Sequence, residues 1–504
     1  MKFLRLLFSK WVVSALLFII QIAIIVLVIA LFNSYYGVFQ IITSLIGVIV
    51  YFFIINKREN VDYKVPWLVL IAIFPLFGTV FYLLFANRKM RKKESALMKR
   101  VVDEVGPYLN YEYDPATLGD QNDSVSYLIN SSFMPPCFNN DVKYYPVGEL
   151  MWEDMLEELK KAKKFILMEY FIVDPGKMWD SIHEILVAKA KEGVKVHLLY
   201  DDVGTVTMLP SSYYKKLREE GIDAHKFNPF RPVLSSIYNN RDHRKIMVID
   251  GEVGFTGGIN LGDEYINQND RLGHWKDTGM RLKGSAVNSL TALFFLNFSV
   301  AKNSFDNYGE YLLKEPIKYE EEGCIVPFGC GPKPIYQEQV GENNFINLIS
   351  HAKRYVYITT PYLIIDYALT NALRVAALRG VDVRIITPHI PDKKVVFSMT
   401  RTSYKFLQEA GVKIYEYTPG FIHAKMLIAD DEVAFVGTIN LDYRSLTHHF
   451  ECGALIYKNH IINDIKEDFD KTIEASEEKT LENFKLGWGW RLLNAILTPF
   501  KAMF

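Results

Sequence analysis

The residues of this sequence that could do chemistry lie in two copies of one short motif. The spacing H-x-K-x4-D occurs twice, 180 positions apart, and the two copies are His243, Lys245 and Asp250, and His423, Lys425 and Asp430. Two histidines and two lysines are what a phosphodiester-exchanging site needs. One imidazole can attack phosphorus, the other can carry the proton, and the lysines can hold the phosphate charge. We therefore predict that both copies contribute to one catalytic site.

The two aspartates belong to the candidate catalytic set, but a second interpretation stays open for them. Asp250 and Asp430 end short apolar runs, residues 246–249 and 426–429, which predict strands. A carboxylate at a strand end suits a turn, where it would anchor the backbone instead of moving a proton. On such a strand the His and the Lys of each motif share one face, which must then be polar and bind anions.

A second repeat accompanies the first. Gly-Gly-Ile-Asn-Leu at 257–261 matches Gly-Thr-Ile-Asn-Leu at 437–441, again 180 positions later. Two unrelated surface strand ends that happen to carry His and Lys would have no reason to share this turn, which argues against coincidence. Its asparagines, Asn260 and Asn440, are candidates for neutral hydrogen-bond donors beside the phosphate.

The elements that must position these motifs repeat as well. In the first half we predict helices at 148–163 and 178–192 and strands at 165–173 and 194–200. In the second half we predict helices at 344–353 and 367–378 and strands at 355–360 and 381–387. Helices that alternate with buried strands indicate α/β units around a mixed or parallel sheet. A pseudo-twofold relation between two such units would bring the motif strands together at their interface, where pockets tend to form.

Three uncharged apolar stretches, residues 11–32, 37–55 and 66–86, precede these units. Each is near the ~20 residues that a helix needs to cross a bilayer, so we predict N-terminal transmembrane helices. The first is too long for a cleaved signal peptide and no A-x-A site follows it. Basic residues at 88–93 favour a cytoplasmic catalytic region, while Lys2, Arg5 and Lys10 favour a cytoplasmic N-terminus. Three full crossings would place the N-terminus and the catalytic region on opposite sides of the membrane. Either the first stretch therefore lies partly in the membrane interface, or one of the two basic segments does not face the cytoplasm.

These features divide the chain into five parts. We expect a membrane anchor at 1–86, a polar linker with some helix at 87–123, a first half at 124–320, a second half at 321–480 and an amphipathic tail at 481–504. The tail carries Trp488 and Trp490 among apolar and basic residues, which suits a helix lying at a membrane surface. A terminal helix docked on the core is the alternative.

Composition limits the remaining functions. A net charge of -1 over 504 residues argues against general nucleic-acid binding, which needs a basic surface. The cysteines show neither a C-x-x-C pattern nor a disulfide framework, and they are Cys137, Cys324, Cys330 and Cys452. Metal-ligand spacing, a phosphate-binding loop and a dinucleotide fingerprint are all missing from the sequence, so we expect no metal and no cofactor.

On these motifs the sequence resembles the bacterial cardiolipin synthases of the phospholipase D superfamily, from about residue 36 to the C-terminus. The matching stretches are Asn240-Arg241-Asp242-His243-Arg244-Lys245, Ile249-Asp250-Gly251, Gly257-Gly258-Ile259-Asn260, Pro361-Tyr362-Leu363, His423-Ala424-Lys425, Asn440-Leu441-Asp442-Tyr443-Arg444-Ser445 and Phe450-Glu451. No motif residue is missing. His449 stands where the family usually has Asn, and nothing in the sequence suggests that this alters the chemistry.

The resemblance implies a phospholipase D-type α/β sandwich of two halves and a two-step phosphatidyl transfer. His243 would attack the phosphorus of a phosphatidyl donor to form a phosphohistidine. His423 would protonate the departing glycerol and then activate the hydroxyl of a second phosphatidylglycerol, although the sequence alone permits the two histidines to exchange roles. Glu451 matches the family's position for a carboxylate that holds an imidazole, and Asp277 looks like its counterpart in the first half.

Several functions share these motifs. A phospholipase D with water as acceptor, or a transferase with another alcohol, is the nearest alternative to cardiolipin synthesis, because pocket shape and water exclusion choose the acceptor. The near-zero charge and the apolar segments disfavour a nuclease, and two complete motifs disfavour a silent membrane scaffold. Phosphatidylglycerol and membrane lipids are the expected partners, nucleic acid is not, and the sequence does not specify an oligomeric state.

Overall fold

The computed structural model describes residues 36–86, 90–109, 111–229, 240–482 and 486–503, and a few positions between 16 and 27. The predicted apolar segment 11–32 therefore lies largely outside the described residues. The chain forms two compact units. Of the described residues, the helical unit comprises those between 16 and 27, 36–86 and Ala495–Met503, and the α/β unit comprises 90–109, 111–229, 240–482 and 486–494.

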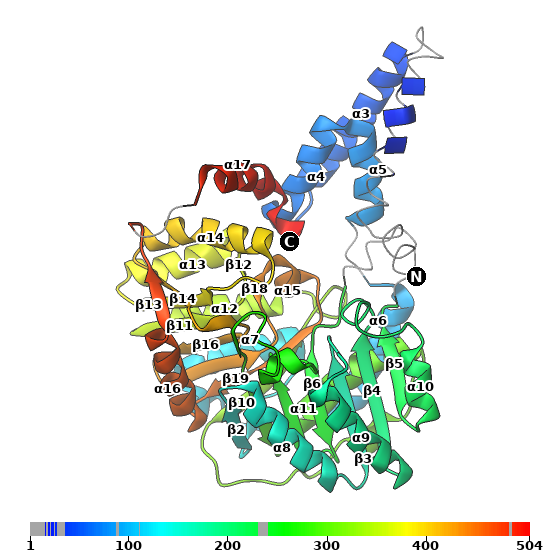
Figure 1. Cartoon of the computed structure of the whole chain (residues 1–504), viewed down its shortest axis with the longest axis vertical. Coiled ribbons are helices and arrows are strands. Elements are labelled where there is room, and N and C mark those ends of the chain that lie inside the picture. Colours follow the sequence, from blue (N-terminus) through cyan, green and yellow to red (C-terminus); the bar gives the residue numbers. More distant parts are fainter. Residues whose placement is uncertain are drawn as a thin grey trace. The chain divides into compact units, whose positions relative to one another are not determined.

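The helical unit contains α3 (Tyr36–Ile55), α4 (Val61–Ile73), α5 (Pro75–Phe85) and the C-terminal η6 (Thr498–Met503) (Figure 1). Within the described part of the chain, one helix is long and apolar enough to cross a membrane, the 19 residues Gly37–Ile55. The stretch predicted as a third spanning helix, 66–86, is not one helix. Phe74 leaves the helical conformation and Pro75 opens a new helix, so α4 and α5 have only 13 and 11 residues.

The first sheet of the α/β unit carries the first motif. Its seven strands run in the order β2 (Asp141–Tyr145), β9 (Gly279–Lys283), β7 (Val253–Gly257), β6 (Lys245–Ile249), β3 (Phe165–Tyr170), β4 (Lys195–Asp201) and β5 (Asp223–Phe227). The second sheet has nine strands in the order β1 (Cys137–Phe138), β10 (Cys324–Cys330), β19 (Glu451–Tyr457), β17 (Val433–Gly437), β16 (Met426–Ala429), β11 (Tyr355–Thr359), β13 (Asp382–Pro388), β14 (Lys413–Tyr417) and β20 (Ser476–Lys479).

The two sheets repeat one pairing pattern. β3 runs parallel to β4 and antiparallel to β6, just as β11 runs parallel to β13 and antiparallel to β16. β6 and β16 lie within the two motifs, before their aspartates, and each forms a hairpin with the next strand, β7 or β17. The chain is therefore a mixed α/β protein of two similar halves, which confirms that part of the predicted fold.

Helices cover both sheets and fill the space between them. The first sheet is covered by α8 (Gly148–Lys161), α9 (Lys177–Lys191) and α10 (Tyr213–Glu219), and the second by α12 (Val340–His351), α13 (Tyr367–Leu378), α14 (Lys394–Gln408) and α16 (Ile461–Glu474). α11 (Ala286–Lys302) contacts β5 and β6 of the first sheet and β10 of the second. Its residues 286–299 are all buried, so it belongs to the core that the two halves share.

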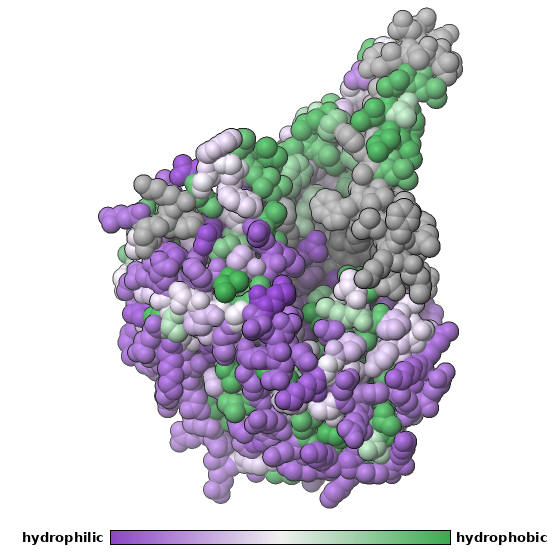
Figure 2. All heavy atoms as spheres, in the orientation of Figure 1, coloured by the Kyte–Doolittle hydropathy of each residue, from purple (hydrophilic) through white to green (hydrophobic). Residues whose placement is uncertain are grey.

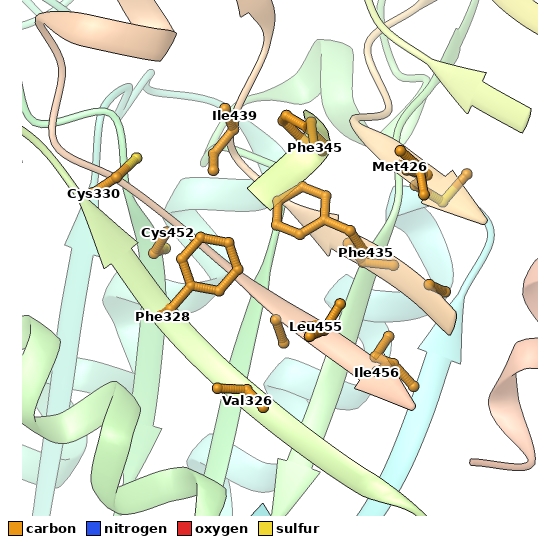
Figure 3. Close-up of a cluster of buried hydrophobic side chains, with 14 of the residues drawn as sticks. Val326, Phe328, Cys330, Phe345, Met426, Phe435, Ile439, Cys452, Leu455 and Ile456 are labelled. Carbon is orange, nitrogen blue, oxygen red and sulfur yellow. The ribbon is translucent and has the colours of Figure 1, made fainter. Parts of the chain in front are cut away.

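Alternating side chains of each strand divide between two hydrophobic cores. Phe165 and Leu167 of β3 join the core that includes both sheets, while Ile166 and Met168 join the core that includes α8 and α9. On the second sheet, apolar side chains of β10, β16, β17 and β19 gather near Phe345 of α12 (Figure 3). The rings of Phe345 and Phe435 are 5.0 Å apart, edge to face.

Part of the stretch expected to be a linker, 87–123, belongs to this core. α6 (Lys92–Val105) packs against α11 and buries Met98, Val101 and Val105. In addition, α7 (Asn122–Ser132) and β1 precede the first sheet in sequence but contact α12 and β10 of the second half. The two halves are therefore interleaved, and no single position in the sequence separates them.

Further short helices and strands accompany the two sheets and the longer helices. They are η1 (Gly106–Tyr108), η2 (Pro115–Gln121), β8 (His274–Lys276), η4 (Asp263–Ile266), η5 (Tyr308–Tyr311), β12 (Leu363–Ile364), β15 (Gly420–Ile422), β18 (Leu441–Asp442), α15 (Tyr443–Thr447) and α17 (Trp488–Leu497).

Candidate active site

Each motif begins just before a strand of one half and is held by the backbone of the other half. β15, which precedes His423, pairs in parallel with β8, and Asp242 forms an isolated bridge with Phe450. The backbone N–H of His243 donates to the carbonyl of Phe450 at 2.9 Å, and that of His423 donates to the carbonyl of Lys276 at 2.7 Å. These crossed contacts bring the two motif copies into one site.

The two histidines are oriented by carboxylates that also cross between the halves. Nδ1 of His243 lies 2.9 Å from Oε2 of Glu451, and Nδ1 of His423 lies 2.6 Å from Oδ2 of Asp277. Both carboxylates are fully buried. Because a carboxylate accepts, Nδ1 carries the proton in each ring, and Nε2 keeps its lone pair for a reaction partner.

The two motif lysines are almost completely buried, with 1% of each residue exposed. Nζ of Lys245 donates to the carbonyl of His243 at 2.6 Å, and Nζ of Lys425 donates to the carbonyl of His423. Burial lowers the pKa of Lys245 to about 8, against the opposing effect of Glu451 and Asp277. Burial lowers the pKa of Lys425 to about 7, and the nearby charge of Lys245 adds to that effect. Two amines of this kind gain strongly from an anion between them.

The same environment keeps both imidazoles neutral in the free protein. The pKa of His243 lies well below the ordinary histidine value, first because of burial and then because of the charges of Lys245, Lys425 and His423. Burial and then Lys425 lower the pKa of His423 to about 4, although Asp277 opposes them. An arriving phosphate anion would offset the lysine charges and so favour protonation of the histidine that acts as the acid.

The two motif aspartates lie away from the histidines, at the far ends of their strands. The carboxylate of Asp250 accepts the backbone N–H groups of Lys163, Lys164 and Phe165 at 2.7 to 2.8 Å. That of Asp430 accepts the N–H groups of Lys353, Arg354 and Tyr355 at 2.6 to 2.9 Å. Asp250 is five residues from Lys245 along the strand, which amounts to about 16 Å. This arrangement suits the turn-anchoring interpretation.

The two asparagines differ in their contacts. Asn260 accepts the backbone N–H of Ile172 at 3.1 Å and donates to the hydroxyl of Tyr265 at 2.7 Å. Oδ1 of Asn440 is buried and has no hydrogen-bond partner among the described residues. The amide of Asn260 therefore already serves to tie the strand end to an aromatic side chain.

Several residues around the histidines were not predicted. Phe171 packs against His243 with ring centroids 4.9 Å apart, and Trp275 packs against His423 at 5.2 Å. The hydroxyl of Thr438 donates to Oε2 of Glu451. Thr438 lies inside the repeated turn and replaces the Gly258 of the first copy, so a comparison of the two copies could have pointed to it.

One group of side chains has the donor atoms that a metal would need. Among the described residues, donor atoms of His243, His449 and Glu451 lie within 4.8 Å of one another. The buried ammonium groups of Lys245 and Lys425 act on His243 and oppose a second cation there. The site is instead built for an anion: two neutral imidazoles with fixed tautomers and two buried amines can bind a phosphodiester and exchange its substituents.

Comparisons with known proteins agree with this chemistry. A family model described as "Cardiolipin synthase, PLD-like domain" matches residues 155–277 and 345–473, half of the chain, and includes both motifs. An uncharacterized protein of Streptococcus mutans is 43% identical over 86% of this chain and 95% of its own length. The cardiolipin synthase of Halalkalibacterium halodurans is 33% identical over 92% of this chain and 94% of its own length. The crystal structure of phosphatidylserine synthase from Haemophilus influenzae shares the fold, with a TM-score of 0.57 at 14% identity over 76% of this chain and 98% of that chain.

Proposed function

This chain belongs to the family of cardiolipin synthases with phospholipase D-like domains, and from that premise we propose that it transfers a phosphatidyl group between two phosphatidylglycerol molecules. The products are cardiolipin and glycerol. The observation that carries the proposal is the crossed pair of histidines. Each imidazole is held by a buried carboxylate of the opposite half, and two buried lysines accompany them.

In the first step, Nε2 of His243 attacks the phosphorus of the donor phosphatidylglycerol. The bond from phosphorus to the glycerol headgroup breaks, His423 gives its proton to the departing oxygen, and a phosphatidyl group remains on His243. Lys245 and Lys425 hold the two non-bridging phosphoryl oxygens while negative charge develops on them. Glu451 and Asp277 stabilise the positive charge that each imidazole acquires in turn.

In the second step, the now neutral His423 takes the proton from a hydroxyl of the second phosphatidylglycerol. That oxygen attacks phosphorus, the bond to His243 breaks, and cardiolipin leaves. Atoms and protons balance over the cycle, since the proton given to glycerol is recovered from the acceptor. Asn440, whose Oδ1 lacks a partner among the described residues, is the asparagine better placed to contact this chemistry.

We also propose that the chain acts at a membrane and is held there by α3. The helix exposes Ile41, Leu45, Ile49 and Phe52, each by more than half of its surface. In Figure 2, polar side chains cover most of the visible face of the α/β unit, whereas the visible helices of the helical unit are largely apolar. The basic residues at 88–93 favour a cytoplasmic catalytic unit. Exposed Trp488 and Leu492 on α17 suit a further contact with the lipid surface.

The test is to incubate the purified full chain with phosphatidylglycerol alone in mixed micelles and to measure lipids and free glycerol by mass spectrometry. We expect cardiolipin and glycerol to rise one to one, and neither to form with His243→Ala or His423→Ala. Phosphatidic acid in place of cardiolipin would refute the acceptor and make the protein a phospholipase D. No product from any phosphatidyl donor, with or without added alcohols, would refute the transferase.

A further inference from the structure

The two halves place different residues at one equivalent position beside the catalytic histidines. Gly279 pairs with Gly257 in the first sheet, and Gly453 pairs with Gly437 in the second, so Asp277 and Glu451 occupy matching positions. The residue two positions before each carboxylate is Trp275 in the first half and His449 in the second. Both rings pack on a catalytic imidazole.

The contact on the His243 side is with a second imidazole. The rings of His449 and His243 have centroids 5.6 Å apart. Nδ1 of His449 faces Oε1 of Glu451 at 3.5 Å, while Oε2 of the same carboxylate is the atom that holds His243. Nδ1 of His449 and Oε1 of Glu451 are both buried, and neither forms a hydrogen bond among the described residues, so the 3.5 Å approach between them is an electrostatic contact. Glu451 therefore lies between two imidazoles.

The carboxylate on the His423 side is not shared in this way. Oδ2 of Asp277 holds His423, and Oδ1 accepts the backbone N–H of Thr278 at 2.9 Å. Its neighbour Trp275 offers only an indole N–H, which has no partner among the described residues. Asp277 thus gives its charge to one imidazole, whereas Glu451 divides its charge among His243, His449 and the hydroxyl of Thr438.

From this asymmetry we infer that His449 is a positioning residue for His243: its ring N–H faces the second oxygen of Glu451 at 3.5 Å and so limits how strongly that carboxylate can stabilise a protonated His243. A histidine that stays neutral is available as the nucleophile, and a histidine with a carboxylate of its own is better suited to carry the proton. His449, which stands where the family usually has Asn, thereby acquires a role. The inference rests on the proposed function for its kinetic meaning, but not for its effect on His243.

His449 can act in this way because it is itself neutral. Burial lowers its pKa to about 3, against the raising effect of Glu451. The other charged or titratable groups that act on His243 or His449 are Lys245, Lys425, His423, Lys393 and Arg444. None of these is changed by a substitution at position 449, so a shift in the titration of His243 can be assigned to the loss of the second imidazole.

The decisive variant is His449→Phe, which keeps an aromatic ring and removes the N–H donor. Glu451 then faces His243 with less of its charge engaged, the imidazolium of His243 is stabilised, and its pKa rises by about one unit. The acid limb of kcat/KM for phosphatidylglycerol should move up by the same amount. At pH values well below the wild-type acid limb, activity should then fall about tenfold relative to the wild-type protein, with less than about threefold change on the plateau. His449→Asn, which restores a short donor, should recover part of the shift.

Trp275→Phe is the matched control, because it trims the equivalent ring on the other half without touching Glu451. Its acid limb should stay in place. Nitrogen-15 NMR of the histidine-labelled full chain in micelles, with His243 assigned by its absence in His243→Ala, measures the titration of His243 without requiring turnover. An unchanged His243 titration in His449→Phe overturns the inference even if the enzyme is active. An altered titration in a protein that makes no cardiolipin supports the inference and refutes only the proposed function.

The same three side chains could instead serve a metal, and the experiment separates that interpretation. The titrations are repeated with EDTA and with added Zn²⁺. A wild-type profile that moves with chelator or metal, while His449→Phe does not respond, overturns the positioning role in favour of a metal site. A wild-type titration that changes neither with EDTA nor with added Zn²⁺ supports the positioning role.

Discussion

The two buried lysines predict a steep alkaline limit for catalysis. The pKa of Lys245 is about 8 and that of Lys425 about 7 in the free protein, mainly because both amines are buried. The phosphodiester of phosphatidylglycerol does not titrate in this range, so it binds to the form in which both amines are charged. Since two protons are lost above about pH 8, kcat/KM should fall about a hundredfold per pH unit there.

The magnitude follows from the two values. The fraction of enzyme with both amines charged falls about 500-fold between pH 7 and pH 9 for these pKa values, but only by several per cent for two ordinary lysines. In the complex, the bound anion stabilises both ammonium groups. The alkaline limb of kcat should therefore lie at higher pH than that of kcat/KM.

The assay uses initial rates at sub-saturating phosphatidylglycerol in mixed micelles of constant composition and ionic strength, from pH 6 to 10. The matched variant is Lys425→Arg, because a guanidinium stays charged throughout this range. In this variant the alkaline fall of kcat/KM should reflect the loss of one proton instead of two, so the slope of log kcat/KM against pH falls from about two to about one. The remaining fall is set by Lys245, whose pKa is about 8. Both proteins are measured in the same micelles, so the effect of the anionic surface on local pH cancels.

Three results would each refute this reasoning. One is a wild-type limb of slope one. Another is a limb that begins only above about pH 9.5, the range of solvated lysines. The third is a Lys425→Arg profile with the slope of the wild-type protein. Any of these would mean that the two amines are not the charged groups on which phosphate binding depends.

Three further predictions concern the remaining site residues. A phosphatidyl donor whose leaving group is p-nitrophenol needs no acid catalyst. With this donor, His423→Ala should still release a burst of p-nitrophenolate equal to the enzyme present, and His243→Ala should release none. Equal bursts from the two variants would contradict the assignment of His243 as the nucleophile. Asp277→Asn and Glu451→Gln should each lower kcat by about 10²–10⁴-fold with KM changed less than about threefold, because the amide no longer holds Nδ1–H or the imidazolium charge; a selective rise in KM would contradict this. Asp250→Ala should lower the free energy of unfolding by about 3 kcal/mol in urea titrations, since three backbone N–H groups lose their acceptor, while kcat per folded molecule persists; loss of kcat in the folded variant would return the aspartate to the chemistry.

The sequence was sufficient for the parts of this fold that depend on local pattern. The strand within each motif is predicted by a short apolar run, and the two-half α/β fold is predicted by the repeated order of helices and strands. Some helix is expected in 87–123, and the place of α6 in the core could also have been recognised, because Met98, Val101 and Val105 recur at helical spacing. By contrast, the break at Phe74 and Pro75 lies inside a continuous apolar run, which a hydropathy criterion cannot see.

The orienting contacts of the site depend on long-range packing that no local pattern encodes. Glu451 reaches His243 across 208 positions, and Asp277 reaches His423 across 146. A motif can show that a histidine needs a carboxylate, and family resemblance can suggest which one. The crossing of the two pairs between the halves, however, appears only once both sheets and their shared core are assembled.

Duplication explains why there are two histidines, and divergence explains how they can do different work. A transfer between two lipids needs one imidazole that attacks phosphorus and another that moves a proton, yet the motif residues of the two halves are the same. The differences lie one layer further out, in the residues that surround the histidines. Three divergent pairs are Gly258 and Thr438, Asp277 and Glu451, and Trp275 and His449. All of them alter the hydrogen bonding of the two orienting carboxylates or the rings beside the histidines, and none alters the histidines or the lysines themselves. A twofold set of reactive groups can therefore support an asymmetric reaction, provided that the groups around it are not symmetric.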